Sequence, residues 1–145
     1  MNEEAGKRPA QPSGIGILAV RVAMAAVLIV AGFRKFFVDG IPATVEFFQQ
    51  FPMPYPELAA PVVATIELGG GILLLLGLAG RLLGAIYTAE FIYAFSVVKL
   101  PLMGWDLARI DLMLIAGGLL LVFAGSGTVS LDHLMRRRSR AAAPA

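Results

Sequence analysis

Residues Val62–Ala79 read VVATIELGGGILLLLGLA, an apolar, glycine-rich stretch with a single carboxylate, Glu67, near its middle. In a soluble protein this stretch would form a buried core helix. In a membrane-spanning helix a carboxylate is energetically costly, and it usually has a specific partner or role. The remainder of the chain distinguishes between these two interpretations.

The composition favours the membrane. Of the 145 residues, 58% are hydrophobic and 15% are charged, whereas a typical soluble domain is about 45–50% apolar and about 25% charged. One core cannot bury this excess, so we expect an integral membrane protein. The length allows about four spans of roughly 20 residues and leaves no room for a second domain.

The residue types exclude several kinds of chemistry. The chain has no cysteine, which excludes a disulfide framework, thiol–disulfide exchange and thiolate metal ligation by this chain. We find no nucleophile–base pair, metal-ligand cluster or dinucleotide fingerprint. We therefore expect no intrinsic cofactor, no metal and no self-sufficient catalytic site. A redox role would need a bound cofactor, a quinone or a partner subunit.

The predicted architecture is an all-α, four-helix membrane bundle over residues 14–132, between a disordered tail (1–13) and a basic cytoplasmic tail (133–145). The predicted spans are about 15–37, 57–79, 81–99 and 106–124. A proline- and phenylalanine-containing segment, Pro42–Phe51, predicts a short amphipathic helix that rests in the membrane interface or folds back as a lid. Ser130 is expected to cap a short helix that leads into the basic tail.

The distribution of cations predicts the orientation. Placing both termini in the cytoplasm puts most basic residues on the inner side: Lys7, Arg8, Arg81, Arg136, Arg137, Arg138 and Arg140. This arrangement satisfies the positive-inside rule. We interpret the basic tail as a topology anchor rather than as a nucleic-acid-binding segment.

Small residues recur on the predicted helix faces. Gly32, Gly70, Gly71 and Gly118 are expected to let neighbouring helices approach closely. The adjacent glycines Gly69–Gly71 also weaken their helix locally, so a kink or the close approach of a ligand is expected there.

Charged residues inside the spans are the candidate ligand-binding or proton-path residues. They are Arg21, Lys35, Glu67, Glu90, Lys99, Arg109 and Asp111. Glu67 and Glu90 are expected near the bilayer centre, on helices joined by a tight turn. We expect Arg21 to reach them in a buried cluster.

A second group of charges is expected to line the outer mouth of the bundle. It comprises Lys35, Lys99, Arg109 and Asp111. The alternative is that all these charges form packing pairs that fix the helix register without a further role. The sequence leaves both interpretations open.

Short motifs occur in a distinctive order along all four predicted spans. They are Arg21; Gly32 and Lys35; Glu67, Gly69 and Gly70; Gly77, Leu78 and Arg81; Asp111; and Gly125, Gly127, Ser130, Leu131 and Asp132. In order and spacing they resemble the DoxX-like family of small four-helix integral membrane proteins, over roughly Ile15–Asp132. The resemblance implies a multi-pass protein of the prokaryotic plasma (inner) membrane.

The resemblance also links the chain to redox systems. Some family members are membrane subunits of a thiosulfate:quinone oxidoreductase. Others join a membrane complex that protects against oxidative and thiol stress, with superoxide dismutase and a sulfurtransferase as partners. We therefore expect a non-catalytic or quinone-facing subunit of a redox or oxidative-stress complex.

Other functions remain open. The chain could instead be a small proton- or anion-coupled transporter, or a purely structural membrane scaffold. The expected partners are the lipid bilayer and membrane or peripheral oxidoreductase subunits, and not nucleic acid. Whether the chain also forms a homo-oligomer is left open.

Overall fold

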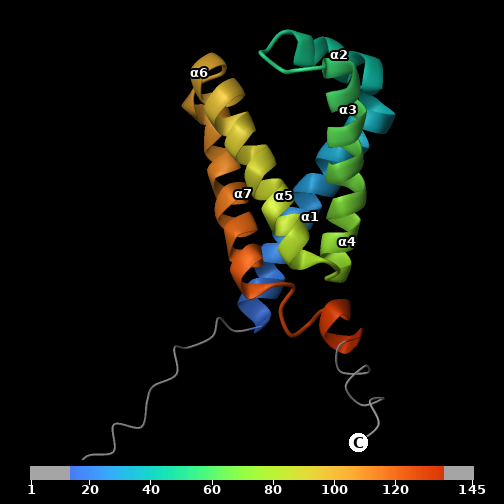
Figure 1. The fold of residues 1–145 in the computed structure, drawn as a ribbon, viewed down its shortest axis with the longest axis vertical. Helices are drawn as coiled ribbons and strands as arrows, with labels where there is room; N and C mark the ends of the chain where they lie inside the picture. Colours follow the sequence, from blue (N-terminus) through green and yellow to red (C-terminus); the bar gives the residue numbers. More distant parts are fainter. Residues whose placement is uncertain (1–13, 136–145) are drawn as a thin grey trace, which may run out of the picture.

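The computed structural model describes residues 14–135, and all regular secondary structure in that range is helical (Figure 1). The elements are α1 (Gly14–Phe33), η1 (Arg34–Val38), α2 (Ile41–Gln49), α3 (Pro56–Thr65), η2 (Ile66–Gly70), α4 (Gly71–Leu76), α5 (Gly80–Tyr93), η3 (Ala94–Lys99), α6 (Leu100–Leu102) and α7 (Trp105–Ala124). The η segments are π-helical, and residues 131–135 form one further short helix. The predicted tails lie outside the described residues, except for 133–135.

These elements join into four rods long and apolar enough to cross a membrane. They are Gly14–Val38, Pro56–Leu76, Gly80–Leu102 and Trp105–Ala124. The predicted four-span, all-α fold is therefore confirmed.

Two span boundaries differ from prediction. The second span ends at Leu76, three residues before the predicted Ala79, because Gly77 adopts a left-handed conformation (φ 75°) that stops the helix. The third span continues beyond the predicted Lys99 to Leu102, because the π-helical segment η3 leads directly into α6.

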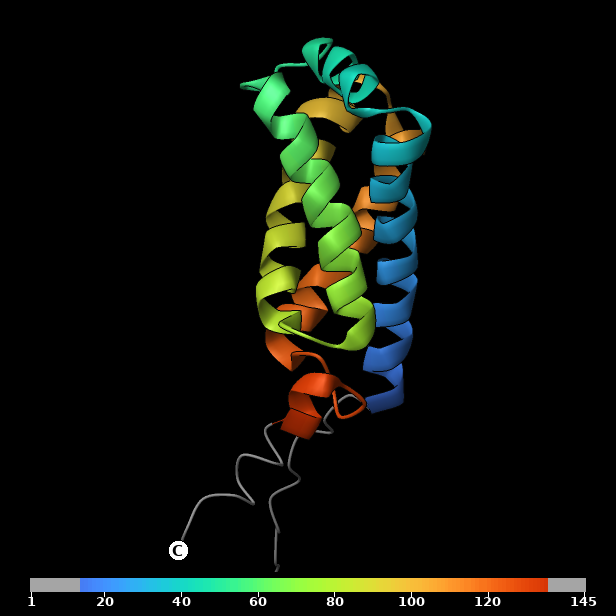
Figure 2. The same cartoon turned by 90° about the vertical axis from the view of Figure 1, so that its right-hand side faces the viewer.

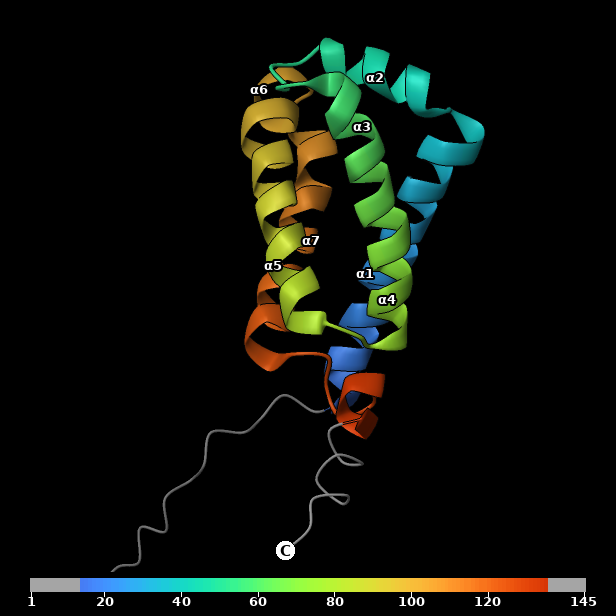
Figure 3. The ribbon, with the colours of Figure 1, turned by 45° about the vertical axis from the view of Figure 1, so that its right-hand side comes forward.

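The four rods form two helical hairpins. The first hairpin consists of Gly14–Val38 and Pro56–Leu76, and the second consists of Gly80–Leu102 and Trp105–Ala124. α5 packs along α7, and α1 packs along η2 and α4. Contacts between α1 and α7 join the hairpins, as Figures 2 and 3 show from two further directions. α2 lies across one end of the bundle, which we call the α2 end. Gly14 and residues 131–135 lie at the other, which we call the terminal end (Figure 1).

The distribution of apolar side chains is that of a protein surrounded by lipid. Leu28, Leu74 and Leu121 are fully buried in the core between the hairpins. Large apolar residues such as Met113 and Phe123 are mostly exposed on the outside, at 69% and 78%. The lipid of a bilayer is a favourable environment for such an apolar surface, while the helices satisfy their own backbone hydrogen bonds.

Glycines set the closest helix contacts. All four glycines expected at packing faces are buried. A Cβ added to Gly32 would collide with the backbone of Leu68, and one added to Gly118 would lie 2.5 Å from Thr88 Oγ1. Gly84, which the sequence did not single out, faces the carbonyl of Gly118 in the same way.

The first prediction concerns Gly32. Replacing it with alanine should lower the free energy of unfolding by about 1–3 kcal/mol, the usual effect of overpacking, because the blocking atoms belong to a backbone. Gly69→Ala is the matched control, since a Cβ there meets nothing within 4 Å. Thermal unfolding in detergent should show a lower midpoint for Gly32→Ala alone. Equal midpoints for the two variants would contradict the packing.

Candidate functional site

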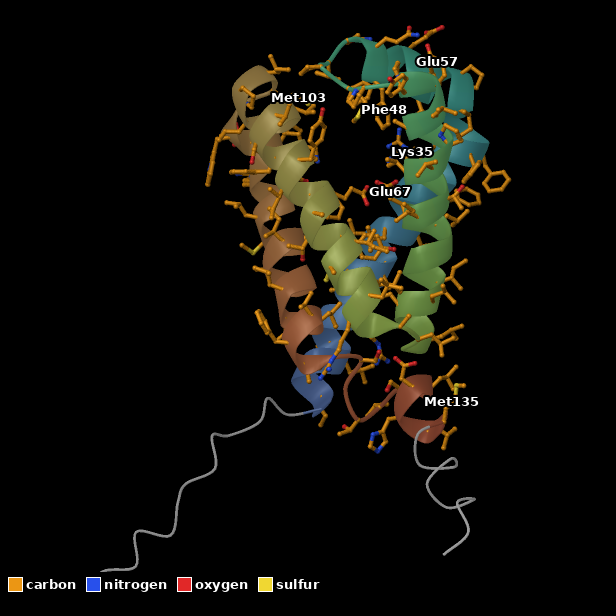
Figure 4. All side chains as sticks on the ribbon, in the orientation of Figure 1. Lys35, Phe48, Glu57, Glu67, Met103 and Met135 are labelled. Atoms are coloured by element: carbon orange, nitrogen blue, oxygen red, sulfur yellow. The ribbon has the colours of Figure 1, made fainter. Side chains whose placement is uncertain are left out.

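An ion pair connects the first two spans in the upper half of the bundle. The ammonium Nζ of Lys35 in η1 donates to Oε2 of Glu67 in η2 at 2.5 Å. Glu67 is only 5% exposed. Figure 4 shows the two side chains near each other in the space below α2. The first hairpin therefore neutralises its own buried carboxylate.

A second ion pair connects the last two spans in the same way. Nζ of Lys99, at the end of η3, donates to Oδ1 of Asp111 in α7 at 2.6 Å. Asp111 is 0% exposed, and its second oxygen, Oδ2, has no hydrogen-bond partner among the described residues. Each hairpin thus contains one internal ion pair.

A third carboxylate, Glu90 of α5, lies among these pairs. It interacts electrostatically with both partners of each ion pair. Its Oε2 is buried and has no hydrogen-bond partner within residues 14–135. Five residues from all four spans therefore form one mixed-charge group, which we call the interior charge cluster: Lys35, Glu67, Glu90, Lys99 and Asp111.

The π-helical segments supply three members of this cluster. Lys35 lies in η1, Glu67 in η2 and Lys99 in η3. π-helical turns are rare and occur frequently at functional sites. In η2 the hydroxyl of Tyr87 donates to the carbonyl of Ile66 at 2.8 Å, which links α5 to the irregular turn.

The α2 end of the cluster is covered. Phe48 of α2 is 8% exposed and lies on the side of α2 that faces Lys35 (Figure 4). The hydroxyl of Tyr93 in α5 donates to the carbonyl of Pro52, just after α2, at 2.7 Å. α2 and the following loop thus form an apolar cover attached to the second hairpin.

The expected contact of Arg21 with Glu67 and Glu90 is wrong. Arg21 is 3% exposed, and its guanidinium points to the terminal end, where it donates to the backbone carbonyls of Ser126 and Val129. A helical side chain leans toward the N-terminus of its own helix. In α1 that direction leads away from Glu67.

Arg21 belongs to a network that fixes the loop after α7. Ser126 Oγ donates to Asp132 Oδ2 at 2.7 Å and accepts from the backbone N–H of Gly80 at 3.0 Å. The backbone N–H of Asp132 donates to the carbonyl of Gly77 at 3.3 Å. This network brings together, at one place, residues from the first, fourth and last of the sequence motifs, namely Arg21, Gly77 and Asp132.

The predicted cap at Ser130 is confirmed. Its Oγ accepts a hydrogen bond from the N–H of His133 at 3.2 Å, at the start of the helix over residues 131–135. A hollow of about 870 Å³ lies nearby, with Arg81, Asp132 and His133 among its lining residues. No member of the interior charge cluster lines it.

The expected outer cluster forms only in part. Lys99 and Asp111 meet, but Lys35 pairs with Glu67 instead. Arg109 is exposed and pairs with Asp106 at 3.3 Å on the surface of α7. Within residues 14–135 no group of three histidine, cysteine or acidic residues could hold a metal ion.

Four apolar spans around buried ion pairs define a small integral membrane protein. Comparison with known families gives the same class: the DoxX family profile matches residues 16–100. The chain belongs to the DoxX family, as the sequence motifs predicted.

The curated relatives agree with this assignment. CatD of Bacillus subtilis (strain 168), which is named provisionally as an oxidoreductase, is 37% identical over 120 residues, covering 81% of this chain and 85% of CatD. The inner membrane protein YqjF of Escherichia coli (strain K12) is 29% identical over 132 residues, covering 86% and 95%. The inner membrane protein YphA of the same strain is 28% identical over 128 residues, covering 81% and 88%.

No solved structure matches the chain. The two inner membrane relatives and the four candidate spans confirm the predicted location, a multi-pass protein of the inner membrane.

The second prediction concerns the Lys35–Glu67 pair. Glu67→Gln should lower the free energy of unfolding by about 1.5–3 kcal/mol, the usual contribution of a hydrogen bond to a charged group, because Lys35 loses the carboxylate that accepts its hydrogen bond. The double variant Lys35→Met/Glu67→Leu should recover most of the loss, since it removes both charges. The measurement is thermal unfolding in detergent, with the exposed Glu57→Gln as control. A double variant no more stable than Glu67→Gln would show that the pairing does not explain the loss.

Proposed function

We propose that the protein is a membrane subunit of a redox assembly and that its interior charge cluster binds the headgroup of a quinone. The electrons come from a partner oxidoreductase, because the chain has no cysteine and no group of its own that transfers them. The observation that carries this proposal is a cluster of ammonium and carboxyl groups inside an otherwise apolar bundle, in which Glu67 and Asp111 are almost completely buried. The name of the relative CatD supports the redox assignment.

The chemistry of the cluster fits a quinone headgroup. A lysine ammonium has three N–H donors, and the hydrogen bond to its carboxylate partner uses one of them on Lys35 and one on Lys99. The remaining donors suit the carbonyl oxygens of a quinone. Phe48 and the apolar helix faces suit its ring and tail.

The same cluster supports a different function less well. A proton- or anion-coupled transporter would use these residues as a path for protons or anions across the membrane. However, Arg21 is bonded to the loop at the terminal end and does not extend the cluster through the bundle. A scaffold without a ligand would use the ion pairs only to fix helix register. A measurement of quinone binding distinguishes the scaffold, which would bind none, from the quinone-facing subunit.

The orientation proposed for the protein places both termini in the cytoplasm and α2 at the outer surface. Most basic residues outside the cluster then lie on the cytoplasmic side. At the α2 end, Arg34 and Arg109 are each paired with a neighbouring aspartate. α2 then lies in the outer membrane interface, over the cluster.

The third prediction tests quinone binding. The protein in lipid nanodiscs should bind a short-chain quinone, and Lys35→Met/Glu67→Leu should weaken binding at least about tenfold. That factor corresponds to about 1.4 kcal/mol, close to the lower end of the roughly 1.5–3 kcal/mol that a hydrogen bond to a charged group contributes. The exposed pair variant Asp106→Asn/Arg109→Gln is the control. Unchanged binding in the cluster variant, or no binding by the wild type, would reject the proposal. Purification of the protein in mild detergent that retains neither quinone nor an oxidoreductase would also reject it.

The fourth prediction tests the orientation. The chain has no native cysteine, so single cysteines can be introduced at the exposed positions Glu46 and His133. A membrane-impermeant thiol reagent should label Glu46→Cys in intact cells and His133→Cys only in inverted vesicles. The reverse pattern would overturn the orientation.

A further inference from the structure

The charges of the interior cluster do not balance. Glu67, Glu90 and Asp111 contribute three carboxyl groups, whereas Lys35 and Lys99 contribute two ammonium groups. Both lysines are already bonded to a carboxylate, at 2.5 and 2.6 Å. The fully ionised cluster would carry one excess negative charge.

The excess falls on Glu90. Its Oε2 is buried and has no hydrogen-bond partner within the described residues, and Asp111 Oδ2, on a residue that is 0% exposed, is in the same condition. The charged groups that act on Glu90 are Glu67 and Lys35 from the first hairpin and Lys99 and Asp111 from the second. An uncompensated carboxylate in an apolar interior is strongly disfavoured.

Two kinds of species could supply the missing positive charge: a metal cation or a proton. A bound cation needs several oxygen ligands that converge on one point. The described residues contain no such group of three, and the carboxylates of Glu67 and Asp111 each already accept from a lysine. A proton needs only one carboxyl oxygen.

We propose that the interior charge cluster is a proton-binding site and that Glu90 is the carboxyl group that holds the proton at neutral pH. Protonated Glu90 is a neutral hydrogen-bond donor beside two ion pairs. In this form it suits a neutral ligand that offers an acceptor oxygen. The inference rests on the proposed function for the identity of that ligand, but the proton site itself follows from the charges and unpaired oxygens of the chain.

The two ion pairs determine whether the cluster binds or releases a proton when a ligand binds. A ligand that draws Lys35 or Lys99 away from its carboxylate leaves a second carboxylate uncompensated, so the cluster binds another proton. A ligand that adds positive charge has the opposite effect, and Glu90 releases its proton. Proton binding is in this way coupled to ligand binding at the interior charge cluster.

The experiment is infrared spectroscopy of the full chain in nanodiscs, which resolves the carbonyl stretch of a protonated carboxyl group. Wild-type protein should show this band at neutral pH and lose it as the pH rises. Glu90→Gln should lack it at neutral pH, while the exposed control Glu57→Gln should keep it. The band should shift in heavy water, because the proton exchanges.

The stability of Glu90→Gln and one further variant keep the outcome decisive. Glu90→Gln leaves two carboxylates with two ammonium groups, so it should unfold at a temperature no lower than the wild type. If its folding fails, the charge count is wrong and the inference is overturned. Glu90→Asp keeps the acid group, so it should move the band rather than remove it.

The remaining outcomes separate this inference from the proposed function. Absence of the band in the wild type, or its persistence in Glu90→Gln, overturns the proton site whatever binds to the protein. A wild type that shows the band but binds no quinone retains the proton site and rejects the quinone-facing function.

Discussion

The structure depends on the requirement that a carboxylate in an apolar interior must have a counter-charge. Glu67 and Asp111 are almost completely buried, and each is paired with a lysine of the neighbouring span in its own hairpin. Breaking such a pair costs far more than a surface ion pair contributes. The pairs therefore fix which span lies against which within each hairpin.

The terminal end is fixed by a different kind of interaction. Arg21 bonds there to backbone carbonyls, and Ser126 connects the N-terminus of α5 to Asp132. The left-handed turn at Gly77 allows the loop to approach, because a Cβ there would lie 2.6 Å from Ser130 Cβ. One end of the bundle is thus held by a continuous polar network, while the other is covered by α2.

Hydropathy was sufficient to predict the four spans, and the ordered motifs were sufficient to predict the family. The partners of the charges were harder to predict, because the depth of a residue in its span does not show which way its side chain leans. Side chains of helices lean toward the N-terminus of their own helix. This rule directs Arg21 to the terminal end, and it brings Lys35 and Glu67 together because their spans are antiparallel. The same rule explains the meeting of Lys99 and Asp111. The adjacent glycines Gly69–Gly71 indicated a local weakness where the π-helical segment η2 lies. The segments η1 and η3 had no such signal in the sequence, because their turns arise from packing between helices.

The location of the ion pairs has a consequence for ligand entry. Both pairs lie within a hairpin, so separating the hairpins breaks neither of them. α5 is attached to the first hairpin through the Tyr87–Ile66 and Tyr93–Pro52 hydrogen bonds, which join uncharged groups. Neutral hydrogen bonds contribute about 0.5–1.5 kcal/mol each, much less than a buried ion pair costs to break. In the charged interior, the hairpins are therefore bridged by neutral hydrogen bonds rather than by ion pairs, and the unpaired oxygen of Glu90 is a group that a ligand meets without displacing a partner.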